Sequence, residues 1–258
     1  FCMINVLIYG ANGRMGKKVK AALSGESDMR AFCGVDIKED FSDSSFPVFC
    51  NIDEASEKVG KPDVIIDFSS RLSLEKILPY AEKNGVPAVL CATGYTEEDK
   101  KAVSKASEKV ALFRSANMSV GVNVLVKLVK QAAKALSDFD IEIIEKHHNK
   151  KVDAPSGTAV MIADEIKDVL PEKFCVYGRN GIVGKRDKNE IGMHAVRGGN
   201  IVGEHDVLFA GENEVLTLSH SASDRALFAD GAVRAARFIA GKPSGLYDMN
   251  DLFEELGV

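Results

Sequence analysis

Long apolar runs and long runs of one charge are both missing from this sequence of 258 residues. No apolar stretch approaches the roughly 20 residues that cross a bilayer. Bases and acids are interspersed and the net charge is −5, so nucleic acid and anionic membranes are poor candidate partners. The N-terminus lacks the charged segment and apolar core of a signal peptide. We therefore expect a cytoplasmic protein that works on a small molecule.

Cysteine is scarce and shows no functional spacing. The number is odd, no CxxC pair occurs, and most of the residues stand in apolar runs: Cys2, Cys33, Cys50, Cys91 and Cys175. Such cysteines are typical of small buried residues in a reducing compartment. We expect neither a disulfide framework nor a zinc site.

The first half of the chain alternates short apolar runs with helical patterns. Strands are expected at residues 4–9, 31–36, 63–67, 88–91 and 111–114, and helices at 17–23, 72–83 and 96–108. Thr96 and Asp99 resemble a capping box at the start of the last of these helices. Continuous apolar strands between helices are typical of a parallel sheet covered on both faces, which is the α/β class.

The pattern changes after about Asn117. We expect helices at 120–137, 157–169 and 225–240, the last being the final helix, and strands at 140–146, 174–177, 191–197, 201–209 and 214–220. The tail at 246–256 only alternates apolar and acidic residues. Consecutive strands without crossover helices favour an open mixed or antiparallel sheet. The sequence therefore predicts a second domain, of the α+β class.

A glycine-rich motif follows the first strand and opens a helix. It reads Gly10-Ala11-Asn12-Gly13-Arg14-Met15-Gly16. Glycines permit a tight turn close to a pyrophosphate, and a helix N-terminus offers N–H groups and partial positive charge. The spacing is GxxGxxG rather than GxGxxG, so an ordinary glycine-rich turn is the alternative. Its position between a strand and a helix favours dinucleotide binding.

Asp36 ends the second expected strand, twenty residues after Gly16. An acid there accepts hydrogen bonds from the adenosine ribose and repels a 2′-phosphate, which favours NADH over NADPH. Lys38 lies close by and can attract that phosphate, so use of both coenzymes remains open. A solvated acid at a strand end is the alternative interpretation.

The second motif is EKHHNKKVDAPSGTA at residues 145–159. His147 and Lys151 are side chains that can donate a proton in a tuned environment. Lysines at 146, 150 and 151 add positive charge, and the helix that begins at Ser156 offers N–H groups to a carboxylate. The set suits a small anionic substrate that receives a hydride and then a proton.

Two alternatives compete for this motif. His147 and His148 could bind a metal, but adjacent strand residues point to opposite faces and no HExxH-type spacing occurs, so we expect no metal. The lysines could instead form a solvated loop, with Ser156 only capping the helix.

Four segments together resemble the 4-hydroxy-tetrahydrodipicolinate reductase family, also called dihydrodipicolinate reductase. They are GANGRMG at 10–16, SANMSVGVNV at 115–124, EIIEKHHNKKVDAPSGTA at 142–159 and VRGGNIVGEH at 196–205. The resemblance implies a Rossmann-type dinucleotide-binding domain at 1–119 and 226–258, onto which the last helix packs. It also implies a substrate-binding domain at 120–225 whose open sheet builds a homotetramer.

The resemblance also implies residue roles and a reaction. It implies reduction of a cyclic dicarboxylate with NAD(P)H in lysine and diaminopimelate synthesis, with His147 as catalytic acid/base and Lys151 as proton donor. Substrate binding would fall to His148, Ser156, Gly157 and Thr158. Coenzyme binding would fall to Gly10, Ala11, Asn12, Gly13, Arg14, Met15, Asp36, Cys91, Ala92, Thr93, Ser115, Ala116, Asn117 and Met118.

Two departures from the family pattern bear on the coenzyme. The family often has Gly-Thr-Thr-Gly where this chain has Cys91-Ala92-Thr93-Gly94, so one hydroxyl is missing. Ile37 stands where some members carry an arginine suited to a 2′-phosphate.

Two other classes of protein are considered. One is another two-domain NAD(P)-dependent dehydrogenase of a small amino or keto acid. A phosphorylating semialdehyde dehydrogenase of this class would need an activated catalytic cysteine, and no histidine adjoins Cys91 in the sequence. The other is a nucleotide-sensing module, which would not need the histidine–lysine loop.

Overall fold

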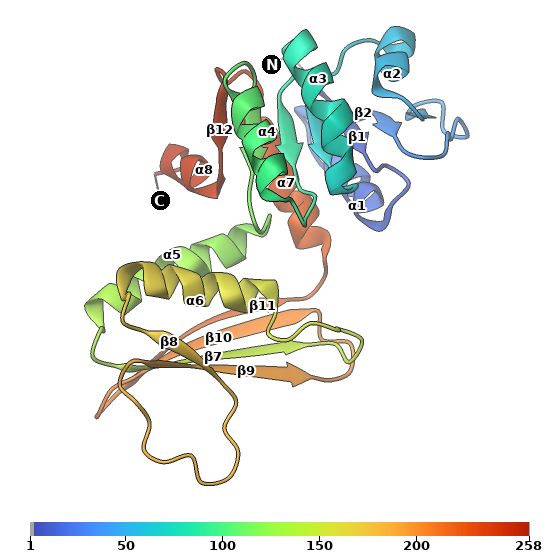
Figure 1. The fold of residues 1–258 in the computed structure, drawn as a ribbon. Coiled ribbons are helices and arrows are strands. Elements are labelled where there is room, and N and C mark those ends of the chain that lie inside the picture. Colours follow the sequence, from blue (N-terminus) through green and yellow to red (C-terminus); the bar gives the residue numbers. More distant parts are fainter. Residues whose placement is uncertain (1–2, 258) are drawn as a thin grey trace. The chain divides into compact units, whose positions relative to one another are not determined.

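A computed structural model describes residues 3–257, and the chain separates into two units at Ser119 and Ala226. The first unit ends at Ser119 and resumes at Ala226; the second is Val120–Arg225. Each unit has its own sheet and helices (Figure 1). Cys2 lies outside the described residues. Between residues 3 and 257, no helix is both long and apolar enough to cross a membrane.

The first unit is built on a seven-stranded parallel sheet with the order β12-β6-β5-β4-β1-β2-β3. Its strands are β1 (Ile4–Tyr9), β2 (Met29–Val35), β3 (Val48–Phe49), β4 (Val64–Asp67), β5 (Ala88–Leu90), β6 (Ala111–Arg114) and β12 (Gly245–Tyr247). Six of them follow the doubly wound order of dinucleotide-binding sheets. The α/β parallel sheet predicted for the first half is therefore confirmed.

Helices pack on this sheet in two groups (Figure 1). They are α1 (Arg14–Leu23), α2 (Ile52–Val59), α3 (Leu74–Asn84), α4 (Glu97–Ser107), α7 (Ala226–Ile239) and α8 (Met249–Glu255), with a short 3₁₀ turn η1 (Arg71–Ser73). α1 contacts α7, while α3 contacts both α2 and α4. The predicted capping box of Thr96 and Asp99 is present at the start of α4.

The prediction that the helix at 225–240 is the last one is wrong. α7 does pack on α1 and on β4 to β6, but β12 and α8 follow it in the tail. Met249, Leu252 and Phe253 are buried at helical spacing, and Asp248 with Asp251 forms a capping box. The short β3 was also not predicted, because a two-residue strand shows no periodicity. α2 was not predicted either, although its N-cap residue Asn51 and the acidic Asp53 and Glu54 of its first turn are local signals.

The second unit holds a five-stranded mixed sheet with the order β11-β10-β7-β9-β8. Its elements are α5 (Val120–Ala135), β7 (Asp140–His147), α6 (Gly157–Val169), β8 (Phe174–Tyr177), β9 (Glu190–Arg197), β10 (Gly203–Ala210) and β11 (Val215–Ala222). β8, β9 and β7 are parallel, and β10 pairs antiparallel with both β7 and β11. The mixed open sheet is confirmed.

α5 and α6 pack together on one face of this sheet (Figure 1). Strict alternation along β7 buries Ile141 and Ile143 beneath the helices and leaves Glu142 and Ile144 on the other face. That second face has no helix of the unit upon it. The sheet is therefore covered on one side only, which is common where strands run antiparallel.

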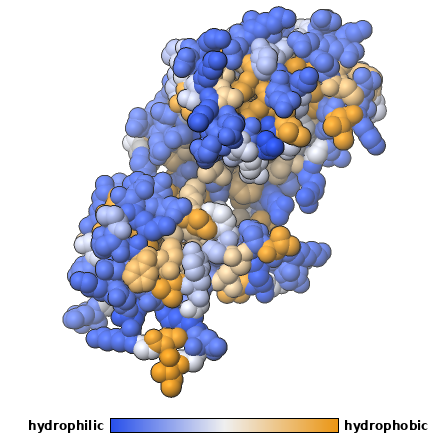
Figure 2. Space-filling view, in the orientation of Figure 1, coloured by the Kyte–Doolittle hydropathy of each residue, from blue (hydrophilic) through white to orange (hydrophobic). Residues whose placement is uncertain are grey.

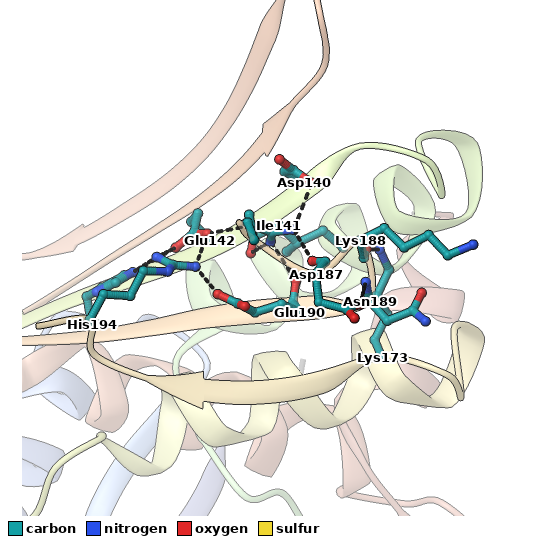
Figure 3. Close-up of polar contacts among 11 residues, drawn as sticks. Asp140, Ile141, Glu142, Lys173, Asp187, Lys188, Asn189, Glu190 and His194 are labelled. Carbon is teal, nitrogen blue, oxygen red and sulfur yellow. Dashed lines mark hydrogen bonds and ion pairs between the residues drawn. The ribbon is translucent and has the colours of Figure 1, made fainter. Parts of the chain in front are cut away.

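The loop between β8 and β9 is fastened to the uncovered face (Figure 3). Arg186 binds Asp140 at 2.7 Å and the carbonyl oxygen of Ile141 at 3.0 Å, and Arg179 pairs with Glu142 and Glu190. His194 Nε2 lies 2.7 Å from Glu142. At the loop tip, Ile182 and Val183 are exposed, and Figure 2 shows the resulting apolar group.

Candidate active site

The glycine-rich turn joins β1 to α1 in the first unit. Gly10 has a φ of 83°, which favours glycine. A Cβ on Gly16 would lie 2.2 Å from the carbonyl oxygen of Gly10, so only glycine allows the helix to start this close to the strand. Gly13 caps α1 with no side-chain hydrogen bond. The first turn of α1, which carries Arg14 and Met15, therefore presents its N–H groups without a side-chain acceptor, as a phosphate site requires.

Asp36 immediately follows β2 and lies beside this turn. Its two carboxylate oxygens accept the backbone N–H of Asn12 at 2.8 Å and of Ile37 at 2.7 Å. The Asn12 side chain donates to the carbonyl oxygen of Lys38 at 2.8 Å. The acid is thus held in a fixed position, and each carboxylate oxygen keeps capacity for a further donor, such as a ribose hydroxyl.

The remaining coenzyme candidates also follow strand ends of the same sheet. Cys91, Ala92 and Thr93 come after β5, and Ser115 to Met118 come after β6. Since all the strands are parallel, these segments and the glycine turn lie at one edge, where α/β sheets bind ligands. The donor set fits a dinucleotide.

Cys91 is not an activated nucleophile. Burial raises the pKa of its thiol well above the ordinary value, and the nearby Asp67 carboxylate adds to the effect. Catalytic cysteines need the opposite environment. This geometry argues against the phosphorylating semialdehyde dehydrogenase considered above.

A buried carboxylate organises the second candidate cluster, in the other unit. Glu145 is 1% exposed on β7 and lies 2.6 Å from His147 Nδ1. Arg197, which pairs with His147 in the β7–β9 register, donates two parallel hydrogen bonds to Glu145 at 2.7 and 2.6 Å. Burial acts to raise the pKa of Glu145, but the bonds from Arg197 and His147 outweigh it and lower the pKa.

The N-terminus of α6 is hydrogen-bonded to the same carboxylate, that of Glu145. The backbone N–H of Ser156 donates to Glu145 at 3.0 Å, and the Ser156 hydroxyl accepts the N–H of Ala159 at 3.2 Å as the helix N-cap. That hydroxyl also lies 2.9 Å from Nε2 of the buried His205. Gly157 and Thr158 form the first turn of α6, at the end of the helix that carries partial positive charge.

His205 is a neutral ring inside this cluster. Burial lowers the pKa of His205 to about 4, and the neighbouring His147 adds to the effect. The two rings meet edge to face with centroids 5.3 Å apart. His205 therefore supports Ser156 without adding charge near neutral pH.

The other predicted residues of this loop divide between two faces. Lys151 pairs with Asp153 at 2.9 Å. His148 has a buried Nδ1 with no partner in residues 3–257, and its Nε2 lies 3.4 Å from Arg225. Lys146 instead pairs with Glu204 and Asp206 on the opposite face of β7 from His147. The expectation that Lys146 adds charge to the substrate cluster is therefore wrong, because strand neighbours alternate faces.

Sequence reasoning missed Glu145, Arg197, His205 and Asp153 as functional candidates. One signal for Glu145 was present: it stands two residues before His147 in a strand, and such residues share a face. Arg197 and His205 lie in the quoted segment at 196–205, but only strand pairing brings them to the cluster. The part of the chain that the structure describes holds no group of three or more histidine, cysteine or acidic side chains placed to bind a metal.

Two family models match consecutive parts of the chain. The model described as "Dihydrodipicolinate reductase, N-terminus" matches residues 4–118, and "Dihydrodipicolinate reductase, C-terminus" matches residues 121–253. Curated proteins named 4-hydroxy-tetrahydrodipicolinate reductase are similar over full length. The one from Caldanaerobacter subterraneus subsp. tengcongensis is 52% identical over 98% of this chain and 99% of its own. The one from Clostridium tetani is 47% identical over 97% of each.

A solved structure of the same kind is also similar. It is a dipicolinate-bound dihydrodipicolinate reductase from Paenisporosarcina sp. TG-14, with a TM-score of 0.80 and 27% identity. The match covers 96% of this chain and 99% of that one. The similarity therefore extends over both units and is not limited to the dinucleotide-binding fold.

Proposed function

This chain belongs to the dihydrodipicolinate reductase family, and we propose that it reduces 4-hydroxy-tetrahydrodipicolinate to tetrahydrodipicolinate with a nicotinamide coenzyme. It is an oxidoreductase of lysine and diaminopimelate synthesis. The observation that carries the proposal is the meeting of His147, the α6 N-terminus and the Lys151 loop in one cluster. That cluster has the charge and donors that a small dicarboxylate needs.

Substrate binding is assigned to the start of α6 and to the loop before it. One carboxylate of the substrate accepts N–H groups from Gly157 and Thr158, where the helix end carries partial positive charge. The second is bound by His148, whose buried Nδ1 has no partner among the described residues, and by Lys151. Each carboxylate needs such a partner to offset the cost of its desolvation.

The chemistry combines hydride delivery with proton transfer. A nicotinamide coenzyme held by the first unit would supply a hydride to the ring of the dehydrated, conjugated-imine form of the substrate. His147 and Lys151 hold the proton that the resulting enamine takes up. Lys151 is kept near the cluster by Asp153 at 2.9 Å and can exchange this ion pair for a substrate carboxylate.

We assign coenzyme binding to the first unit. The turn from Gly10 to Met15 binds the pyrophosphate, Asp36 the adenosine ribose, and the segments at 91–93 and 115–118 the nicotinamide side. NADH is favoured over NADPH, because a fixed carboxylate at Asp36 repels a 2′-phosphate. Lys38 reduces the difference, so both coenzymes are accepted. We place the enzyme in the cytoplasm, as a homotetramer formed through the sheet of the second unit.

Turnover of Lys151→Ala tests the assignment of the loop. The variant should lose about 10²-fold in kcat, the usual size of a lost general acid, while NADH affinity stays unchanged. The assay follows NADH consumption with the cyclic substrate formed from pyruvate and aspartate semialdehyde. Calorimetric titration with NADH and then pyridine-2,6-dicarboxylate separates the two sites.

Lys146→Ala is the matched control, since it removes the same charge from the face of β7 opposite His147. His147→Ala should lower kcat by a similar factor, with a smaller effect on substrate KM. Normal turnover by Lys151→Ala, or loss of NADH affinity in place of dicarboxylate affinity, would contradict this assignment. Absence of turnover by the wild type, with activity on an open-chain amino or keto acid, would favour the other dehydrogenase class.

A further inference from the structure

Glu145 is a buried carboxylate that the reaction itself does not use. Its oxygens contact four nitrogen atoms: two from Arg197, the backbone N–H of Ser156 and Nδ1 of His147, at 2.6 to 3.0 Å. A buried charge with this many short, charge-assisted contacts is held rigidly. Two of these contacts come from the groups assigned above to catalysis and to substrate binding.

We propose that Glu145, held in place by Arg197, is the positioning residue that fixes the catalytic ring of His147 and the substrate-binding end of α6 relative to each other. The proposal rests on the function assigned above. Glu145 has 1% of its side chain exposed and acts through His147 and Ser156. Arg197 is needed for this positioning, because without its positive charge the Glu145 carboxylate would be buried with too little compensating charge.

The first consequence concerns the proton on the His147 ring. An ionised carboxylate has acceptors only, so the nitrogen 2.6 Å from it must carry a hydrogen. Nδ1 of His147 is therefore the protonated nitrogen of the neutral ring, and Nε2 is the atom left to exchange a proton. Nε2 lies on the side of Gly203, where a Cβ would come within 3.1 Å of it.

The second consequence concerns distance between the two groups. Glu145 uses Oε1 for Ser156 and Oε2 for His147, so a single planar group sets both positions. Arg197 binds both oxygens and also donates to the carbonyl oxygen of Asp153 at 2.8 Å, ahead of the helix. Rotation of the carboxylate would move the ring and the helix start together, and the bidentate guanidinium prevents it.

The charges around His147 come from several elements. Glu145 is on β7, Arg197 on β9, and the neutral His205 on β10, with His220 opposite His205 on β11. The preceding loop contributes the Lys151–Asp153 pair. Among these groups, Glu145 alone touches the ring with a negative charge. Its removal should therefore take away the acceptor that fixes the hydrogen on Nδ1 of the ring.

Glu145→Gln is the decisive variant. An amide keeps the shape but offers one acceptor oxygen where the carboxylate offers two, and it turns an NH₂ toward other donors. We expect kcat to fall about 10²-fold and NADH affinity to remain unchanged. In ¹⁵N NMR spectra, the ring signals of His147 should lose the pattern of a ring protonated at Nδ1. These signals are assigned as the ones that disappear from the spectrum of His147→Gln.

Glu142→Gln is the matched control. Glu142 lies on the same strand but the opposite face, and it has the same kinds of partner, namely two arginines and His194 (Figure 3). This variant should change kcat by less than about 3-fold and leave the ¹⁵N pattern of His147 in place. If both variants lose activity equally and keep the wild-type ¹⁵N pattern of His147, Glu145 has a general structural role and the proposal is overturned.

Arg197→Lys is the second variant, in case Glu145→Gln does not fold. It keeps the charge but loses the bidentate contact, so we expect an intermediate loss of kcat, about 10-fold, with a mixed ring protonation pattern. Wild-type kcat and ¹⁵N pattern in both variants would overturn the proposal. The spectra need no substrate, so they test the positioning of His147 even if the wild-type enzyme fails to reduce 4-hydroxy-tetrahydrodipicolinate, a result that would overturn the function alone.

Discussion

At the scale of single residues, a substitution at Gly157 distinguishes a role in substrate binding from a purely structural role. A Cβ at this position would meet no atom within 4 Å. Gly157→Ala should therefore fold normally, and its Tm should be unchanged or slightly higher, because alanine restricts the unfolded chain. If a substrate carboxylate binds to this backbone, the added methyl group hinders it sterically. We expect KM for substrate, and Kd for pyridine-2,6-dicarboxylate, to rise about 10-fold; an unchanged Kd would remove Gly157 from the site.

Asp36 carries the prediction about coenzyme choice. KM should be modestly lower for NADH than for NADPH, and Asp36→Ala should lose most of this discrimination, because the charge that repels a 2′-phosphate is gone. The variant also loses an acceptor for Asn12, which affects both coenzymes alike and cancels in their ratio. Steady-state kinetics with both coenzymes measures it. An equal or reversed preference in the wild type would refute the assignment.

At the scale of elements, β10 buries a histidine that should make the second unit sensitive to acid. Burial lowers the pKa of His205 from 6.5 to about 4. Between these values the unfolded chain binds a proton that the folded chain does not, so stability is full above pH 6.5 and falls as the pH drops toward 4. The loss is about 3 kcal/mol at most. Thermal unfolding followed by circular dichroism across this range checks it.

His205→Gln should flatten much of that slope. Some slope should remain, because burial also lowers the pKa of His220 on β11. Glu145 and Glu142 have lowered pKa values too, but as acids they act only below about pH 4.5, at the acid end of this window. An identical slope in wild type and His205→Gln would contradict the prediction.

At the scale of the whole molecule, the uncovered face of the second sheet predicts self-association. Val196 on β9 and Val215 on β11 are exposed there, and the apolar tip of the β8–β9 loop extends the surface. Uncovered apolar sheet faces are usually covered by a partner. Light scattering at micromolar concentration should report four times the 27.9 kDa chain mass. Val196→Glu should give smaller species, whereas Leu72→Glu, exposed in the first unit, should not; a stable wild-type monomer would refute the tetramer.

The sequence alone determined both fold classes and most of the elements. Apolar runs and helical spacing are local, so β1, β4, β6, α4 and α6 were placed within a few residues of their observed bounds. Elements without a local pattern, such as β3, could not be found this way. The types of residue needed for the chemistry were also visible, because they cluster in two short segments.

How those residues meet depends on tertiary contacts. Glu145, Ser156, Arg197 and His205 are brought together by the pairing of β7 with β9 and β10 and by the packing of α6. Strand alternation turned Lys146 away from the cluster, and the loop geometry paired Lys151 with Asp153. Register and side-chain direction depend on hydrogen bonds between segments far apart in the chain, such as the one between Lys146 and Glu204, which are 58 residues apart. No local pattern encodes these long-range hydrogen bonds, so the buried carboxylate that links the ring to the helix appeared only in the folded chain.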